Sequence, residues 1–178
     1  MDANLARTWC EVVILGFTGT QVGMTTPQQA SVCYALKWYR PEEFHHGDCF
    51  GADAQAHRYA LLCDPTVKIV IHPPVDPRKR AYCSGALLLE EKPYLVRNKE
   101  IVGMSDVILA APKDLEELRS GTWSTIRYAA KKLKPVLIVY PDGGGLWVPQ
   151  NAGPAWRDLV SYWNPPEPIP THGARVTR

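Results

Sequence analysis

Short apolar runs that alternate with helical patterns constrain the fold of this chain more than any other feature of its sequence. The clearest runs cover residues 12–15, 67–71, 106–111 and 135–140, and a shorter strand is expected at residues 44–46. A continuous apolar run of this length is typical of a strand buried on both faces. Strands that alternate with helices form a parallel sheet with helices on both of its faces. We therefore expect a Rossmann-like α/β fold with a doubly wound, parallel, five-stranded sheet.

Helix signals fill the gaps between these strands. Thr25 and Pro27 form a capping start, and the helix they open is expected to bury Ala30, Cys33 and Leu36 before it ends near Tyr39. Three further helices are expected at residues 52–62, 95–103 and 123–133. A glycine cluster at 142–145 is expected to close the unit, and a last amphipathic helix is expected around residues 156–163.

Composition supports one globular domain. The chain has 178 residues, of which 46% are hydrophobic and 21% charged, and this balance excludes a disordered, collagen-like or coiled-coil chain. We expect a single domain over residues 1–164 and a proline-rich tail over 165–178. Residues 73–93 form a long connection rich in Pro, Arg and Lys, and such connections are usually functional or mobile.

The net charge and the cysteines indicate which partners and which cellular compartment to expect. Twenty Lys and Arg against 18 Asp and Glu give a net charge of +2, which does not favour nucleic-acid binding. No apolar run approaches the roughly 20 residues of a membrane span, and the N-terminus does not resemble a signal peptide. The five cysteines are odd in number and form no C-x-x-C pair, which argues against a disulfide framework or a zinc site. We expect a cytoplasmic protein without metal or cofactor.

Small and polar residues follow the expected strands, at the edge where parallel sheets bind ligands. The first turn carries Gly16, Thr18, Gly19 and Thr20. Its glycines permit close approach of the backbone, and successive N–H groups in such a turn bind anions. A tight turn without a ligand is the alternative.

The second turn opens a helix. It contains Gly47, Asp48, Gly51, Ala52 and Asp53. A glycine-flanked helix start is suited to an anion or a ribose. We expect Asp48 to contact a sugar or to act as a base, and Asp53 to cap the helix. His45 and His46 lack a third ligand at metal-like spacing, so no metal site is expected.

Cationic residues follow the third strand and precede the fourth. His72 ends the third strand, Arg78 and Arg80 lie in the long connection, and Arg97 and Asn98 lie near the start of a helix. They are suited to a phosphate-bearing ligand. The simpler interpretation of the long connection is a solvated loop.

Hydroxyl side chains gather at the start of the helix after the fourth strand. The residues are Ser120, Gly121, Thr122, Ser124 and Thr125. N-capping explains one hydroxyl but not four, so we expect an anion site here.

These segments together resemble the SLOG superfamily, which includes the DNA-processing-A proteins and the LOG-type nucleotide phosphoribohydrolases. The resemblance covers residues 12–140 and rests on segments 16–20, 46–53, 97–106 and 120–125. It implies a Rossmann-like domain with a nucleotide site at the ends of its strands.

The LOG-type branch uses a P-G-G-x-G-T-x-x-E segment, whose glutamate acts with an upstream arginine. In this chain Gly121 and Thr122 match its G-T and Arg97 matches the arginine, but Thr125 stands at the glutamate position. Threonine cannot do the work of a carboxylate, so Asp48, Glu116 or Glu117 would have to replace the glutamate. Our catalytic candidates are Asp48 and Arg97.

The leading hypothesis is a nucleotide-binding protein. Hydrolysis or transfer at an N-glycosidic bond is the first alternative, single-stranded DNA binding is a second, and a scaffold with a vestigial pocket is a third. Trp147, Trp156 and Trp163 are compatible with a homodimer and equally with a cover over the chain's own sheet edge.

Overall fold

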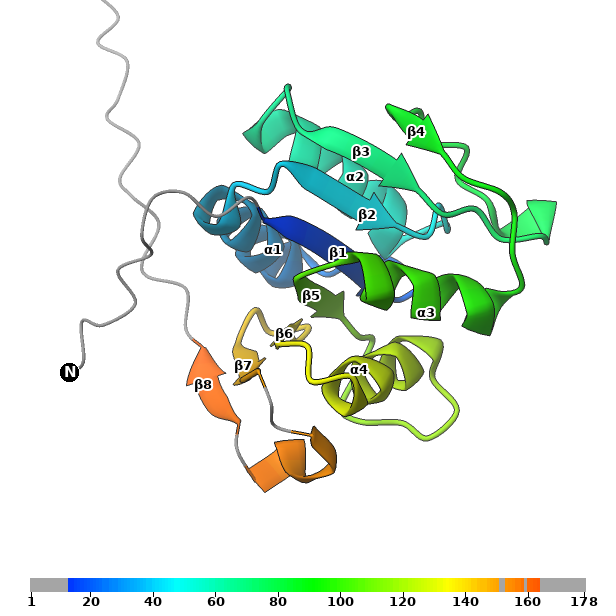
Figure 1. Ribbon diagram of the computed structural model, residues 1–178. Helices are drawn as coiled ribbons and strands as arrows, with labels where there is room; N and C mark the ends of the chain where they lie inside the picture. The colour runs from blue at the N-terminus through cyan, green and yellow to red at the C-terminus, as the bar shows by residue number, and fades with distance from the viewer. Residues whose placement is uncertain (1–12, 151–152, 159, 164–178) are drawn as a thin grey trace, which may run out of the picture.

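A single eight-stranded sheet forms the centre of the protein. The computed structural model describes residues 13–150, 153–158 and 160–163. The strand order is β4-β3-β2-β1-β5-β6-β7-β8 (Figure 1), with parallel pairs from β4 to β6 and antiparallel pairs from β6 to β8. The strands are β1 Ile14–Gly19, β2 Glu43–His46, β3 Lys68–Ile71, β4 Leu87–Leu88, β5 Val107–Ala111, β6 Val136–Val139, β7 Gly145–Val148 and β8 Ser161–Trp163.

The expected five-stranded, purely parallel, doubly wound sheet is therefore wrong in its strand number and in its last strands. The five expected strands exist and lie together, but β4, β7 and β8 extend the sheet. β4 and β8 have two and three residues, which is too short for a periodic signal. The glycine cluster does not close the unit, because Gly143 takes a φ of 89° in a hairpin that leads from β6 to β7.

Four α-helices connect the parallel strands. The N-cap of the first helix, α1 (Thr26–Tyr39), is as expected, since the Thr25 side chain accepts the Gln28 N–H at 3.3 Å. Ala30, expected in the core, is exposed, and the buried Gln28 side chain instead donates to the Pro112 and Val139 carbonyls at 2.9 and 2.7 Å.

Within the described residues, no helix has the length and apolar character needed to cross a bilayer. The helices are α1 Thr26–Tyr39, α2 Ala52–Cys63, α3 Tyr94–Met104 and α4 Gly121–Lys131, with 3₁₀ turns η1 Pro77–Lys79 and η2 Gly153–Asp158.

The expected last helix is also wrong. Residues 153–158 form the 3₁₀ turn η2, and residues 161–163 form strand β8 on the edge of β7. Trp147 and Trp163 pack against the chain's own core, which supports their role as a sheet cover. A homodimer stays a prediction, and the tail over 165–178 lies outside the described residues.

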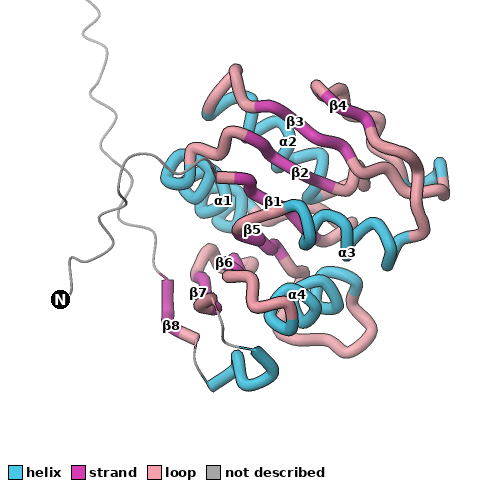
Figure 2. The backbone as a smooth tube through the Cα atoms, viewed as in Figure 1, coloured by secondary structure: helices cyan, strands magenta, loops and turns pink. Residues whose placement is uncertain are grey.

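Helices pack on both faces of the sheet, and each face has its own apolar core. Alternate residues of β1, such as Leu15 and Phe17, pack with α1 and α2. Ile108 and Ala110 of β5 face the other way and pack with Val102 of α3 and with α4. Figure 2 shows α2 behind β2 and β3 and α3 in front of β1. Such burial on both faces explains why these strands are continuous apolar runs.

The direction of winding reverses between β1 and β5. The chain moves from β1 outward to β2 and β3, and α3 then returns it to the other side of β1, where β5 pairs in parallel. Ligands of open α/β sheets bind beyond the carboxyl ends of the strands at such a reversal. The turns after β1 and β2 and the start of α4 therefore lie at the position of interest.

The long connection over residues 73–93 is fastened to this end of the sheet. It contains η1 and β4, and it forms bridges between Cys49 and Arg80 and between Pro74 and Lys92. It therefore forms a further layer beside the turn after β2.

Candidate functional site

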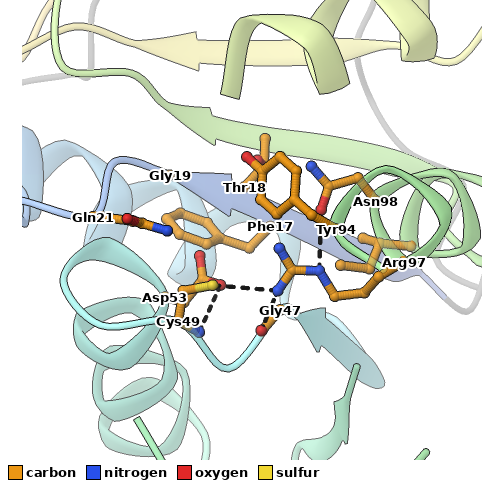
Figure 3. A pocket seen from close by; sticks show the side chains of 11 residues that line it. Phe17, Thr18, Gly19, Gln21, Gly47, Cys49, Asp53, Tyr94, Arg97 and Asn98 are labelled. Atoms are coloured by element: carbon orange, nitrogen blue, oxygen red, sulfur yellow. Dashed lines mark hydrogen bonds between the residues drawn. The ribbon is translucent and has the colours of Figure 1, made fainter. Parts of the chain in front are cut away.

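A small cavity lies at the carboxyl ends of β1 and β2, against α3. Its volume is about 20 Å³, room for about one water molecule. Side chains fill the cleft that we expected to be open, because Tyr94, Arg97 and Asn98 of α3 all point into it (Figure 3). The lining residues are Phe17, Thr18, Gly19, Gln21, Gly47, Cys49, Asp53, Tyr94, Arg97, Asn98 and Ile101.

Glycines at two turns permit this close packing. A Cβ at Gly47 would overlap the Arg97 guanidinium, and one at Gly19 would overlap Ala52 of α2. Gly16 has a different role. Its lack of a side chain leaves room for Ser105 and Ile101 behind the strand. Gly16 therefore supports helix packing and does not line the cavity.

Arg97 is the central residue of the site. Its side chain is buried, and Nη1 donates to the Gly47 carbonyl and, at 3.3 Å, to Cys49 Sγ, while Nε donates to Asn98 Oδ1 at 3.1 Å. The remaining nitrogen, Nη2, makes no hydrogen bond to a described residue. Every side-chain nitrogen and oxygen that is sealed from solvent has a partner in the described part of the chain, so Nη2 must be open to the cavity.

Asp53 is the carboxylate that lines the cavity. It does not cap α2 as expected, because the N-cap is Gly51 and Asp53 lies inside the first turn, where its Oδ2 accepts the Cys49 N–H at 3.2 Å. Burial raises the pKa of Asp53 to about 6, although the nearby Arg97 lowers it. A carboxyl with a pKa near neutrality beside a buried guanidinium is typical of functional sites.

Tyr94 covers the start of α4. Its hydroxyl lies so close to Gly121 that a Cβ there would overlap it, and its ring stacks on the Arg97 guanidinium with 5.0 Å from Cζ to the ring centroid. The backbone N–H groups of Gly121 and Thr122 have no partner among the described residues, as is usual in the first turn of a helix. Tyr94 therefore separates the cavity from these free donors.

The hydroxyls of α4 serve several purposes. Ser120 is the N-cap and accepts the Trp123 N–H at 3.4 Å. Thr125 is buried, donates to the Gly121 carbonyl at 3.0 Å and accepts from Asn98 Nδ2 at 2.6 Å. Thr125 thus connects to Arg97 through Asn98.

Asp48 has other partners than the expected ligand. It is fully buried with a φ of 54°, its Oδ2 accepts from Arg80 Nε at 2.8 Å and its Oδ1 accepts the Cys83 N–H at 2.9 Å. Both carboxylate oxygens thus hold the long connection in place. Arg78 extends into solvent and pairs with Asp76 at 3.0 Å.

Two pairs of buried histidines lie behind the site. His45 and His72 are 3.0 Å apart, and their outer nitrogens bind Glu43 and Glu100 at 3.0 and 3.2 Å. His72 is therefore engaged within the protein and does not line the cavity.

His46, His57 and Cys83 are the described residues that could hold a metal ion, with ligand atoms within 4.8 Å of one another. The hydrogen bonds oppose this use. The Asp48 N–H donates to His46 Nδ1 at 3.1 Å, which places the imidazole proton on Nε2, 3.2 Å from His57 Nδ1. A protonated nitrogen cannot bind a metal, and burial raises the pKa of Cys83 to about 12. We assign no metal to this cluster.

The structure gathers part of the expected site around the cavity. The expected residues that line it are Thr18, Gly19, Gly47, Asp53, Arg97 and Asn98. Those that do not line it are Gly16, Thr20, Asp48, Gly51, Ala52, His72, Arg78, Arg80, Ser120, Gly121, Thr122, Ser124 and Thr125. Sequence reasoning missed Phe17, Gln21, Cys49, Tyr94 and Ile101 as lining residues. Helical spacing gives a signal for Tyr94, which lies three positions before Arg97 and so on the same helix face.

Comparison with known proteins identifies the class of fold. The chain matches no protein-family model and no curated protein. Its structure is similar to that of the molybdenum cofactor binding protein from the phototrophic bacterium Rippkaea orientalis, with a TM-score of 0.57 and 18% identity over 73% of this chain and 77% of that one. This similarity supports a Rossmann-like fold, and at this identity it shows the fold alone. Membership of the SLOG superfamily stays a prediction.

Proposed function

We propose that the chain binds a nucleotide or nucleotide derivative through its phosphate, and that Arg97 is the principal anion contact. The observation that carries this proposal is the buried guanidinium with one nitrogen open to the cavity and without a protein partner. Burying a cation is costly unless an anion compensates it. Asp53 is the one carboxyl in the lining, and although Arg97 lowers its pKa, no ion pair within 4.0 Å joins the two side chains among the described residues. An anionic ligand would supply the missing charge and the missing acceptor.

The phosphate would lie between Arg97 and the free N–H groups of Gly121 and Thr122. A helix start of this kind favours anions through its donors and its dipole. Tyr94 occupies the space between them, so the ligand enters as the Tyr94 side chain rotates outward. In this arrangement Asp53, rather than Asp48, is the carboxyl available to the sugar hydroxyls.

Thermal unfolding with added ligand tests the proposal. At a concentration 100 times its Kd, a ligand adds about 2.7 kcal/mol to the free energy of unfolding, which raises Tm by roughly 5–10 °C in a chain of this size. We expect such a rise with nucleoside monophosphates and a much smaller one with the matching nucleosides. Arg97→Lys should abolish the difference, whereas Arg58→Lys, at an exposed position of α2, should leave it unchanged. Equal shifts with nucleosides and nucleotides, or with Arg97→Lys and wild type, would contradict the proposal.

A second candidate function is cleavage of the N-glycosidic bond of a bound nucleotide. It is favoured by Asp53, whose pKa of about 6 lets its carboxyl gain or lose a proton near neutral pH. Such a group can protonate a leaving base or stabilise a sugar cation. Chromatographic detection of free base would support this function if Asp53→Asn removed it and Asp48→Asn did not. The binding proposal does not depend on that outcome.

A further inference from the structure

Two thiols on neighbouring helices lie side by side, and Cys63 is at the opposite end of α2 from the cavity residue Asp53. Cys33 of α1 and Cys63, the last residue of α2, have their Sγ atoms 3.5 Å apart. Cys63 also lies within hydrogen-bond distance of the Cys33 carbonyl, at 3.8 Å. The distance between two bonded sulfurs is about 2.05 Å, so a change of about 1.5 Å would join them.

The pair is accessible. Both thiols are half-buried and line a groove of about 890 Å³ between the ends of α1 and α2, together with Tyr34, Trp38 and Pro41. The groove is wide enough to admit a small oxidant. By contrast, Cys49 is buried at the cavity beside Arg97.

We propose that Cys33 and Cys63 are a reversible thiol–disulfide pair, which a small disulfide such as oxidised glutathione converts to a cross-link between α1 and α2. This site is separate from the proposed nucleotide site and does not depend on it.

The two cysteines act one after the other in the exchange. The thiolate is the attacking species in disulfide exchange. Whichever thiol loses its proton first makes the first attack, and the other resolves the product. The route that begins at Cys33 is equivalent to the route that begins at Cys63.

The reaction consists of two successive thiol–disulfide exchange steps. The Cys33 thiolate attacks one sulfur of oxidised glutathione, which forms a mixed disulfide and releases one glutathione thiolate. Cys63 then loses its proton to solvent and attacks Cys33 Sγ, which forms the Cys33–Cys63 bond and releases the second glutathione. The protein loses two electrons and two protons, and oxidised glutathione becomes two thiols.

Peptide mapping by mass spectrometry tests the proposal directly. The full chain is incubated with glutathione buffers of increasing oxidised fraction, and free thiols are then blocked. We expect the Cys33–Cys63 peptide pair to appear within the monomer and to disappear on reduction. In Cys63→Ser and in Cys33→Ser, glutathione should remain attached to the one thiol of the pair that is left, because no partner thiol can release it. Cys83→Ser is the matched control and should form the cross-link as wild type does.

Stability gives a second readout. A cross-link that closes a 30-residue separation should raise Tm by roughly 5–15 °C in oxidising buffer, and Cys33→Ser should show no rise. No Cys33–Cys63 peptide in fully oxidised buffer, or a cross-link only between molecules, would overturn the proposal.

Discussion

Asn98 donates a hydrogen bond of 2.6 Å from its Nδ2 to Thr125 Oγ1 and so joins α3 to α4 inside the site. The same amide accepts from Arg97 Nε at 3.1 Å, so its two polar atoms connect the guanidinium to the threonine that stands at the glutamate position of the LOG-type pattern. Thr125 therefore helps to position Arg97 through Asn98. Its hydroxyl also donates to the Gly121 carbonyl at 3.0 Å, which an ionised carboxylate could not do.

Replacement of Thr125 tests this relationship. Thr125→Val keeps the shape but leaves the Asn98 amide without its acceptor, which should cost about 1–3 kcal/mol of unfolding free energy. Thr125→Ser keeps the hydroxyl and should retain most of the stability. Chemical denaturation measures both, and a Val variant as stable as the Ser variant would refute the role of the hydrogen bond.

Tyr94 is expected to control access to the site. Tyr94→Ala removes the ring that covers Gly121 and should tighten binding of a nucleoside monophosphate by about threefold or more, because no closed state then competes with the ligand. Tyr94→Phe keeps the ring and should bind like wild type. Titration calorimetry compares the three proteins, and weaker binding by the Ala variant would show that the ring holds the ligand instead.

Two glycines should respond in opposite ways to alanine. Gly47→Ala places a methyl group against the Arg97 guanidinium and should cost about 1–3 kcal/mol while it weakens nucleotide binding. Gly103 has open space around it within α3, so Gly103→Ala should raise the unfolding free energy by up to about 1 kcal/mol. Denaturation curves give the free energy of unfolding of both variants. Equal changes in the two variants would contradict the packing described at Gly47.

The buried ion pair between Asp48 and Arg80 is expected to be structural. Arg80→Met leaves a buried carboxylate without its cation and should cost about 3–5 kcal/mol of unfolding free energy. Arg78→Met removes an exposed partner of Asp76 and should leave the free energy of unfolding nearly unchanged. If the two variants lost similar amounts of unfolding free energy, the result would contradict the conclusion that Asp48 anchors the long connection.

Stability should fall in mild acid because of His46. Burial lowers the pKa of His46 well below its usual value, with the neighbouring His57 as a further cause. The unfolded chain therefore binds a proton near pH 6.5 that the folded chain does not, and the stabilisation present above pH 6.5 is lost as the pH falls. The part of this loss that is due to His46 is expected between pH 7 and pH 5, where the unfolded chain takes up the proton. His46→Asn, whose oxygen can still accept the Asp48 N–H, should remove that part of the pH dependence; an unchanged dependence would show that His46 does not titrate as described.

Strongly patterned elements could be predicted from the sequence. The central strands, the α1 cap at Thr25 and the helix expected at residues 52–62, which ends at Cys63 in the structure, follow from apolar runs and capping residues. The edge strands β4 and β8 could not, because their few residues owe their conformation to a neighbouring strand and not to a local pattern.

The site was predictable only in outline. Glycine turns and Arg97 indicate the correct edge of the sheet, since position after a strand is a property of the sequence. Which partner a side chain contacts in the folded protein is not a property of the local sequence. Arg80 reaches Asp48 across 32 positions, and Tyr94 fills the space above Gly121, so only tertiary packing shows which carboxyl is engaged and which donors are covered.

Backbone amide shifts in ¹⁵N–¹H spectra test the central claim most directly. The full chain is titrated with a nucleoside monophosphate and, in parallel, with the matching nucleoside. We expect the amides of Gly121 and Thr122 and the Arg97 side-chain N–H to shift with the nucleotide in a saturable way, and to stay in place with the nucleoside. Unmoved signals at millimolar nucleotide, or shifts confined to the groove between α1 and α2, would contradict a phosphate site at Arg97.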